Sequence, residues 1–125
     1  MDYFTGNVKD TPSSEVKIGN SKNTFIQWLV TKDHGTSYAL RRFIVKPKGQ
    51  IQMHYHEYYE SLYIIKGQCK VCVGKETRRL NPGDFIFINS KVKHAIVNEG
   101  DEDLEFLCVI NYADDMKIIP LDEEC

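Results

Sequence analysis

The sequence lacks an excess of charge of either sign. Its 16 basic and 18 acidic side chains are mixed along 125 residues and give a formal net charge of −2. No basic field is present that would attract nucleic acid or anionic lipid, so neither nucleic acid nor a membrane is an expected partner.

Long apolar runs and a leader pattern are also lacking. No window of about 18 apolar residues could span a bilayer, and the start MDYFTGNVKD has no positively charged segment followed by an apolar stretch. We therefore expect a cytoplasmic protein. With 42% hydrophobic residues, the chain suits one compact domain.

Cysteine is scarce, with four residues at irregular spacing. That is too few for a secreted disulfide framework, so we expect free thiols in a reducing compartment. Cys69 and Cys72 form a CxxC, but no second CxxC completes a zinc ribbon. Residues three apart on a strand point to opposite faces, which predicts one packed and one surface thiol.

Short β-branched and aromatic runs dominate from about residue 38. Examples are YALRRFIV, ESLYII, FIFIN and LEFLCVI, separated by turn signals such as PKGQ and NPGD. No ten-residue helical period lies between them, which predicts an all-β fold of antiparallel strands in a barrel or sandwich. We divide the chain into an N-terminal arm and outer strand (residues 1–37), a β-barrel (38–112) and a tail (113–125).

The expected outer strand FIQWLV, residues 25–30, is apolar on both faces. Ile26 and Trp28 lie on one side, and Phe25 and Leu29 on the other. Such a strand needs cover by another layer, and we expect a homodimer. Cover by the C-terminal segment of the same chain is the alternative.

The stretch HYHEYYE holds the most informative polar side chains. On a strand, His54 and His56 share one face about 7 Å apart; Glu60 has the same parity, and His94 begins a later β run. Three imidazoles and a carboxylate suit Mn, Fe, Co, Ni or Zn and leave positions open, whereas a closed structural zinc site more often recruits thiolate. The competing interpretation is a pair of ordinary surface histidines. His34, among turn residues, is expected to be solvated.

Two stretches resemble the paired motifs of the cupin family. GQIQMHYHEYYESLYIIKG matches the first, usually written Gly, five residues, His-x-His, three or four residues, Glu, six residues, Gly, with Gly49 one residue closer than usual. GDFIFINSKVKHAIVN matches the second, ending at Asn98. Asn89 and Lys91 stand where the family usually has Pro and Gly, so the loop before His94 is expected to be remodelled.

This resemblance implies a small single-domain cupin, a double-stranded β-helix or jelly-roll barrel. It also implies that one divalent metal ion, with Mn or Fe favoured, is held by His54, His56, Glu60 and His94.

The alternation in LRRFIVK favours Arg41 and Phe43 as inward-facing side chains. An interior Arg41 could bind a substrate carboxylate or phosphate, and pairing with a neighbouring glutamate is an equal alternative. Cys108 is expected as a small buried filler near the metal. The resulting pocket would be narrow, apolar and fitted to a small-molecule substrate. Its further expected members are Ile51, Leu62, Phe87, Phe106 and Cys108.

The reaction class is open, because a fold does not fix a function. The resemblance favours a metal-dependent oxygenase, with Glu60 also able to act as a catalytic base. The alternatives are a sugar or sugar-phosphate isomerase with a Lewis-acid metal, and a non-catalytic binding or sensor protein.

Overall fold

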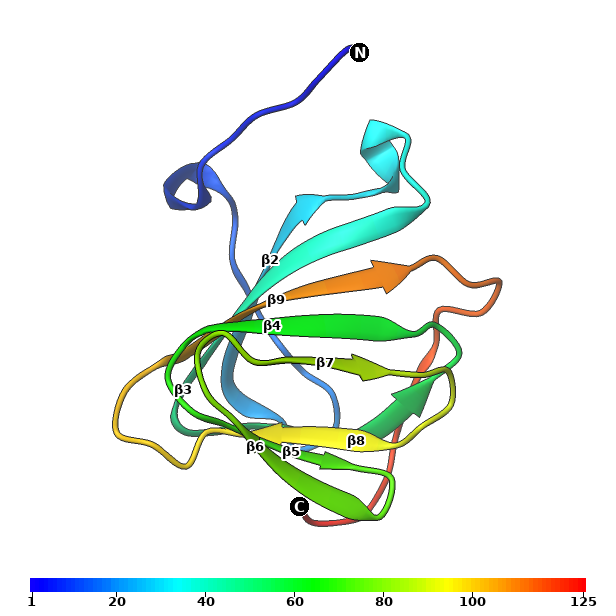
Figure 1. Ribbon diagram of the computed structural model, residues 1–125. Coiled ribbons are helices and arrows are strands. Elements are labelled where there is room, and N and C mark those ends of the chain that lie inside the picture. The colour runs from blue at the N-terminus through cyan, green and yellow to red at the C-terminus, as the bar shows by residue number, and fades with distance from the viewer.

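The computed structural model describes residues 1–125 and consists mainly of strands, which confirms the predicted all-β class (Figure 1). Two short 3-10 turns, η1 (Val8–Asp10) and η2 (Lys32–His34), lie outside the barrel. No helix is long and apolar enough to cross a membrane. The strands are β1 (Ser14–Glu15), β2 (Lys22–Val30), β3 (Tyr38–His56), β4 (Glu60–Lys66), β5 (Cys69–Val73), β6 (Glu76–Leu80), β7 (Phe85–Ile88), β8 (His94–Val97), β9 (Leu104–Asn111) and β10 (Ile118–Pro120).

The long strand β3 joins the two halves of the barrel. The turn predicted at PKGQ is absent, because β3 runs without a break through this segment. Lys48 has a left-handed φ of 67° there, and the partners of β3 change. Its first half pairs with β2 and β9, and its second half with β8 and β10. The local distortion therefore redirects the strand without ending it.

The seven strands in the order β6-β5-β8-β3-β9-β4-β7 curl into a nearly closed antiparallel barrel. Alternate residues of β3 and β4 are buried, so their inward faces supply the core. Phe43 and Phe106 stack inside it with ring centroids 4.9 Å apart. Burial of these apolar faces is the main force that holds the barrel together. Other core members include Val45, Ile51, Leu62, Ile64, Val71, Ile96 and Ile110.

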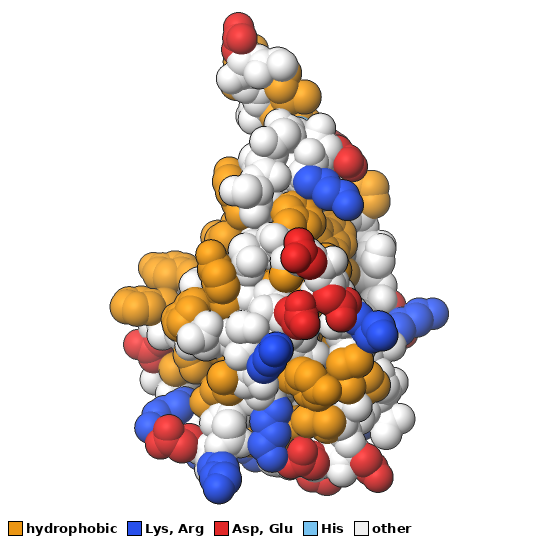
Figure 2. Space-filling model, turned by 90° about the vertical axis from the view of Figure 1, so that its right-hand side faces the viewer, with side chains coloured by type: hydrophobic (Ala, Val, Ile, Leu, Met, Phe, Trp, Pro, Cys, Tyr) orange, Lys and Arg blue, Asp and Glu red, His pale blue; other side chains and the backbone are white.

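The N-terminal arm projects from the barrel beside β2 (Figure 1). The side-chain amide of Gln27 donates to the carbonyls of Val8 and Thr11 and ties the arm to β2. Figure 2 shows the arm at the top and, on this face, acidic and basic side chains intermixed. No residue before Val16 is buried, so the arm contributes little to the core.

The outer strand β2 lies between β1 and β3. Ile26 is buried, but Trp28 on the same face is 44% exposed. The C-terminal segment does not pair with β2, because β10 pairs with β3. The homodimer stays a prediction that a mass measured by light scattering would test.

The expectation of four free thiols is wrong for one pair. Cys72 and Cys125 form a disulfide with their Cα atoms 5.6 Å apart, whereas Cys69 and Cys108 are free and buried. The predicted alternation of Cys69 and Cys72 holds, but the tail covers the outward face of Cys72. A partner 53 residues away in sequence leaves no local pattern from which to predict it.

Candidate metal centre

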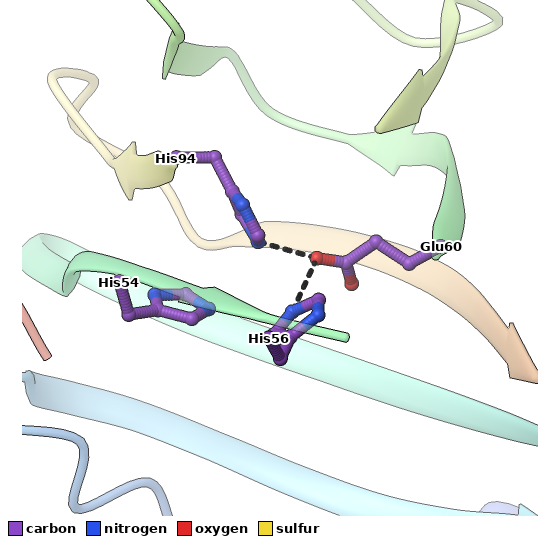
Figure 3. A group of neighbouring side chains, drawn as sticks. All are labelled: His54, His56, Glu60 and His94. Carbon is purple, nitrogen blue, oxygen red and sulfur yellow. Dashed lines mark ion pairs between the residues drawn. The ribbon is translucent and has the colours of Figure 1, made fainter. Parts of the chain in front are cut away.

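Four side chains from three strands converge inside the barrel (Figure 3). His54 and His56 end β3, Glu60 begins β4 and His94 begins β8. All four are buried, and one nitrogen or oxygen of each lies within 4.8 Å of the others. The β3–β8 register sets His54 directly opposite His94, so strand pairing alone brings residues from the two motifs together.

The bend at residues 57–59 returns Glu60 to the histidines. Tyr58 is buried and stacks on the ring of His56 with centroids 3.7 Å apart. The backbone N–H of Tyr59 donates to Asn111 Oδ1 at 2.9 Å. Tyr58 therefore supports a ligand, while Tyr59 is exposed.

The hydrogen bonds of the three rings fix their tautomers. The Nδ1 atoms of His54, His56 and His94 lie 2.7, 2.7 and 2.9 Å from the backbone carbonyls of Gln52, Tyr58 and Val92. A carbonyl oxygen only accepts, so each Nδ1 carries the proton and donates it. Nε2 is then the ring atom of each histidine that is left to bind a metal.

The carboxylate of Glu60 divides its two oxygens between different partners. Oε1 faces the rings, 2.5 Å from His94 Nε2 and 3.4 Å from His56 Nε2. Oε2 accepts from the Cys108 thiol at 2.9 Å and lies 3.4 Å from Arg41 Nη2. One oxygen is thus anchored to the barrel wall, and the other is directed at the centre of the cluster.

The electrostatics favour a cation at this centre. Burial lowers the pKa of His54 to about 3, helped by the neighbouring His94, so this ring is neutral near pH 7. Burial alone would raise the pKa of Glu60, but contacts with His56 and His94 and the charge of Arg41 hold it well below its usual value. Burial alone would lower the pKa of His94, but the contact of its Nε2 with Oε1 of Glu60 raises it. Three imidazole nitrogens and a carboxylate that converge in one buried place form a donor set that fits a divalent metal.

The cluster lines a cavity with a volume of about 30 Å³. A water needs roughly 10–15 Å³ of such space, so the cavity has room for only a few light atoms. Besides the four ligands, it is lined by Ile18, Arg41, Phe43, Ile51, Tyr58, Ile96, Phe106 and Ile118.

Most of the expected pocket residues lie on inward faces. Arg41, Phe43, Ile51 and Phe106 line the cavity directly. Leu62 is fully buried behind its wall. Cys108 also lies behind the wall and reaches the site through its bond to Glu60. Arg41 is 6% exposed, and the glutamate that it pairs with is the ligand Glu60 itself.

The structure corrects the position of Phe87. It pairs with Ser61 on the outer face and is 55% exposed, while Ile86 and Ile88 point inward. The run FIFI is apolar at every position, so alternation could not reveal which residues face inward.

Four lining residues were not predicted. Ile96 shares the parity of His94 and could have been inferred from it. Tyr58 depends on the geometry of the bend. Ile18 and Ile118 belong to the arm and tail, where the sequence carries no periodic pattern that points to the cavity.

The loop before His94 carries the two departures from the second motif, Asn89 and Lys91. Lys91 adopts a left-handed φ of 66° at the position where the family usually has Gly, and its N–H donates to the carbonyl of His56 at 2.8 Å. The amide of the buried Asn98 donates to the carbonyl of Val45 at 2.8 Å. The loop before His94 is therefore fastened to the strand that carries the other histidines.

His34 lies outside the cluster. It is partly buried, its Nδ1 accepts from the N–H of Thr31 at 3.1 Å, and its ring packs on Phe4. The residue caps η2 and is not simply solvated.

Known proteins resemble this chain in sequence and in fold. The family model described as a cupin domain matches residues 41–110. A 1-methylthio-D-xylulose 5-phosphate methylsulfurylase from Rhodospirillum rubrum is 29% identical over 91 residues, which are 73% of this chain and 58% of that protein. A quercetin 2,3-dioxygenase from Bacillus subtilis is 32% identical over 80 residues, 62% of this chain and 20% of that protein. The chain thus spans less than two thirds of either relative's length.

Among solved structures, the polyketide cyclase RemF from Streptomyces resistomycificus superposes with a TM-score of 0.86. The match covers 98% of this chain and 87% of that chain at 21% identity. At this identity the likeness shows a shared fold.

Proposed function

This chain belongs to the cupin family, and on that premise we propose that it is a metal-dependent enzyme of the oxygenase type that acts on a small organic molecule. One observation carries the proposal. Three Nε2 lone pairs and one carboxylate oxygen converge at the wall of an internal cavity, without any thiolate. Such a set leaves coordination positions open toward the cavity.

Manganese or iron is the proposed metal, and either would supply open positions and one-electron chemistry with O2 when bound. The protein's part is to align three imidazoles through their Nδ1–H bonds. The anchored Oε2 of Glu60 fixes the direction of Oε1, and the apolar walls exclude water from the site.

Arg41 is the proposed binding group for an acidic function on the substrate. Its guanidinium lines the cavity beside Glu60, and its buried Nε has no hydrogen-bond partner in the protein. A planar fork of donors binds a carboxylate or phosphate in two places. Glu60 is the proposed catalytic base, because its ionised Oε1 faces the cavity and can accept a substrate proton there.

The test begins with elemental analysis of protein purified without added metal. We then expect O2 uptake by Mn- or Fe-loaded protein with a member of a panel of phenols, thiols and β-diketones. Glu60→Ala should abolish the uptake, and His34→Ala, which removes a histidine outside the cluster, should retain it. Metal-loaded protein that takes up no O2 across the panel would contradict the proposal.

A sugar-phosphate isomerase is the second candidate, favoured by the position of Arg41 and by the sugar phosphate in the name of the R. rubrum relative. There the metal would act as a Lewis acid without redox change. Aldose–ketose interconversion by zinc-loaded protein without O2 would select it. Saturable small-molecule binding without turnover would instead select a non-catalytic binding protein.

A further inference from the structure

Two of the side chains that line the metal cavity lie outside the seven barrel strands, and they are called the closing wall. Ile18 comes from the loop between β1 and β2, and Ile118 from β10. With a volume of about 30 Å³, the cavity is far below the several hundred Å³ of typical ligand pockets. Part of the lining must therefore move before an organic molecule fits beside the ligands.

The chain segment from residue 113 to 125, here called the strap, forms one side of that wall. Its strand β10 pairs with the ligand-bearing end of β3, with Ile118 opposite His56 and Pro120 opposite His54. Beyond β10, the N–H of Leu121 donates to the carbonyl of Met53 at 2.8 Å. The strap is thus a wall strand placed directly beside two of the four ligands.

The strap then crosses the outer face of the barrel and ends at a covalent bond. Leu121 and Cys125 pack against Met53, Cys72 and Ala95. Those three residues belong to β3, β5 and β8, and the Cys72–Cys125 disulfide fixes the strap to β5. It therefore spans the strands that carry all three histidines.

Non-covalent contacts also hold the strap. Strand β10 has three residues and pairs on one side, with β3. The side chains of Gln52 and Lys70 donate to the carbonyls of Leu121 and Cys125. Most residues of the strap are exposed or half-buried, and short segments of this kind open locally at low free energy, so the disulfide adds a restraint to these contacts.

We propose that the thiol–disulfide state of Cys72 and Cys125 controls opening of the strap and so governs access to the metal cavity. A dithiol reductant supplies the two electrons. One of its thiolates attacks Sγ of the partly exposed Cys125, the bond to Cys72 breaks, and Cys72 leaves as a thiolate that takes up a proton. The second thiol of the reductant resolves the mixed disulfide, which releases the Cys125 thiol and leaves the reductant as its own disulfide.

The remaining cysteines do not compete in this exchange. Cys69 and Cys108 are buried, and burial raises the pKa of Cys69 to about 12. A thiol that stays protonated is a poor nucleophile. The inference requires a metal in the cluster but does not depend on the proposed oxygenase reaction.

Cobalt-loaded protein provides the test, since Co²⁺ in this site reports its own removal by absorbance. We expect a chelator to remove Co²⁺ about tenfold faster from reduced than from oxidised protein, with the reductant removed beforehand by anaerobic gel filtration. Cys125→Ser should lose Co²⁺ at the fast rate in both redox conditions. Cys69→Ser should behave like the unmodified protein.

Hydrogen exchange supplies a second measurement that is independent of metal. The amides of Ile118, Ile119 and Leu121 should exchange faster after reduction, while those at the centre of β9 should not change. Equal Co²⁺ removal rates in both redox states would overturn the proposal. So would mass spectrometry that finds Cys72 and Cys125 as thiols after air oxidation of the folded protein.

Discussion

The two walls of the metal cavity are built in different ways. The ligand wall comes from β3, β4 and β8, and the ring nitrogens of its histidines bond to carbonyls only two residues away. The closing wall comes from Ile18 and Ile118, and it depends on a strand pairing and a disulfide between distant segments. Bonds within two residues therefore orient the three rings, whereas contacts between distant segments place Ile118 at the cavity.

The largest expected effect is loss of metal from the ligand wall. His94→Ala removes one of three nitrogen donors, and we expect divalent metal to bind at least about 100-fold more weakly. The measurement is a competition titration with a chelator of known affinity. His34→Ala is the matched control, because that histidine caps η2 outside the site, and its metal affinity should not change.

A drop in pH should lower the free energy of unfolding of the metal-free protein through His54 in the ligand wall. Its pKa is lowered from 6.5 to about 3 in the folded state, so between these values the unfolded chain binds a proton that the folded protein does not. Stability therefore falls as the pH drops. From about pH 7.5 to about pH 5 the loss from this group is about 2 kcal/mol.

Urea unfolding of the metal-free protein at both pH values measures this loss. His54→Gln should lose about 2 kcal/mol less than the unmodified protein over the same interval. An identical pH dependence in the two proteins would show that His54 is not buried in its neutral form.

The hydrogen bond from Cys108 to Glu60 allows a test of whether a ligand needs support from a side chain that is not itself a ligand. Cys108→Ala removes the thiol that donates to Oε2, so the carboxylate should lose part of its fixed direction. We expect metal affinity to fall about tenfold, measured by the same titration. Cys69→Ala removes a buried thiol outside the cluster and should leave the affinity unchanged, whatever its cost in stability.

The smallest effect is expected at the loop that precedes His94. Lys91 has a left-handed φ of 66°, which costs a residue with a Cβ roughly 1–2 kcal/mol. Lys91→Gly should raise the free energy of unfolding by up to about 1 kcal/mol, since glycine also loses more chain entropy on folding. Lys75→Gly, at a position without a positive φ, should lower the free energy of unfolding. If both substitutions raised the free energy of unfolding, the left-handed φ of Lys91 would not be the cause.

Much of the site could be predicted because it follows from parity and spacing. Alternation along β3 sets His54, His56 and Arg41 on inward faces, and the spacing of the two motifs indicates Glu60 and His94. Phe87 shows the limit of this reasoning, because a run that is apolar on both faces gives no sign of which side is buried.

The sequence by itself thus determined the all-β class, through a strand periodicity that acts within a few residues, and it indicated the four candidate ligands through the resemblance to the two cupin motifs. Only the tertiary structure decided the division of the Glu60 oxygens, the Cys72–Cys125 bond and the position of Ile18 and Ile118 at the cavity. Those features depend on which distant segments pack together, and packing of that kind is a property of the whole folded chain.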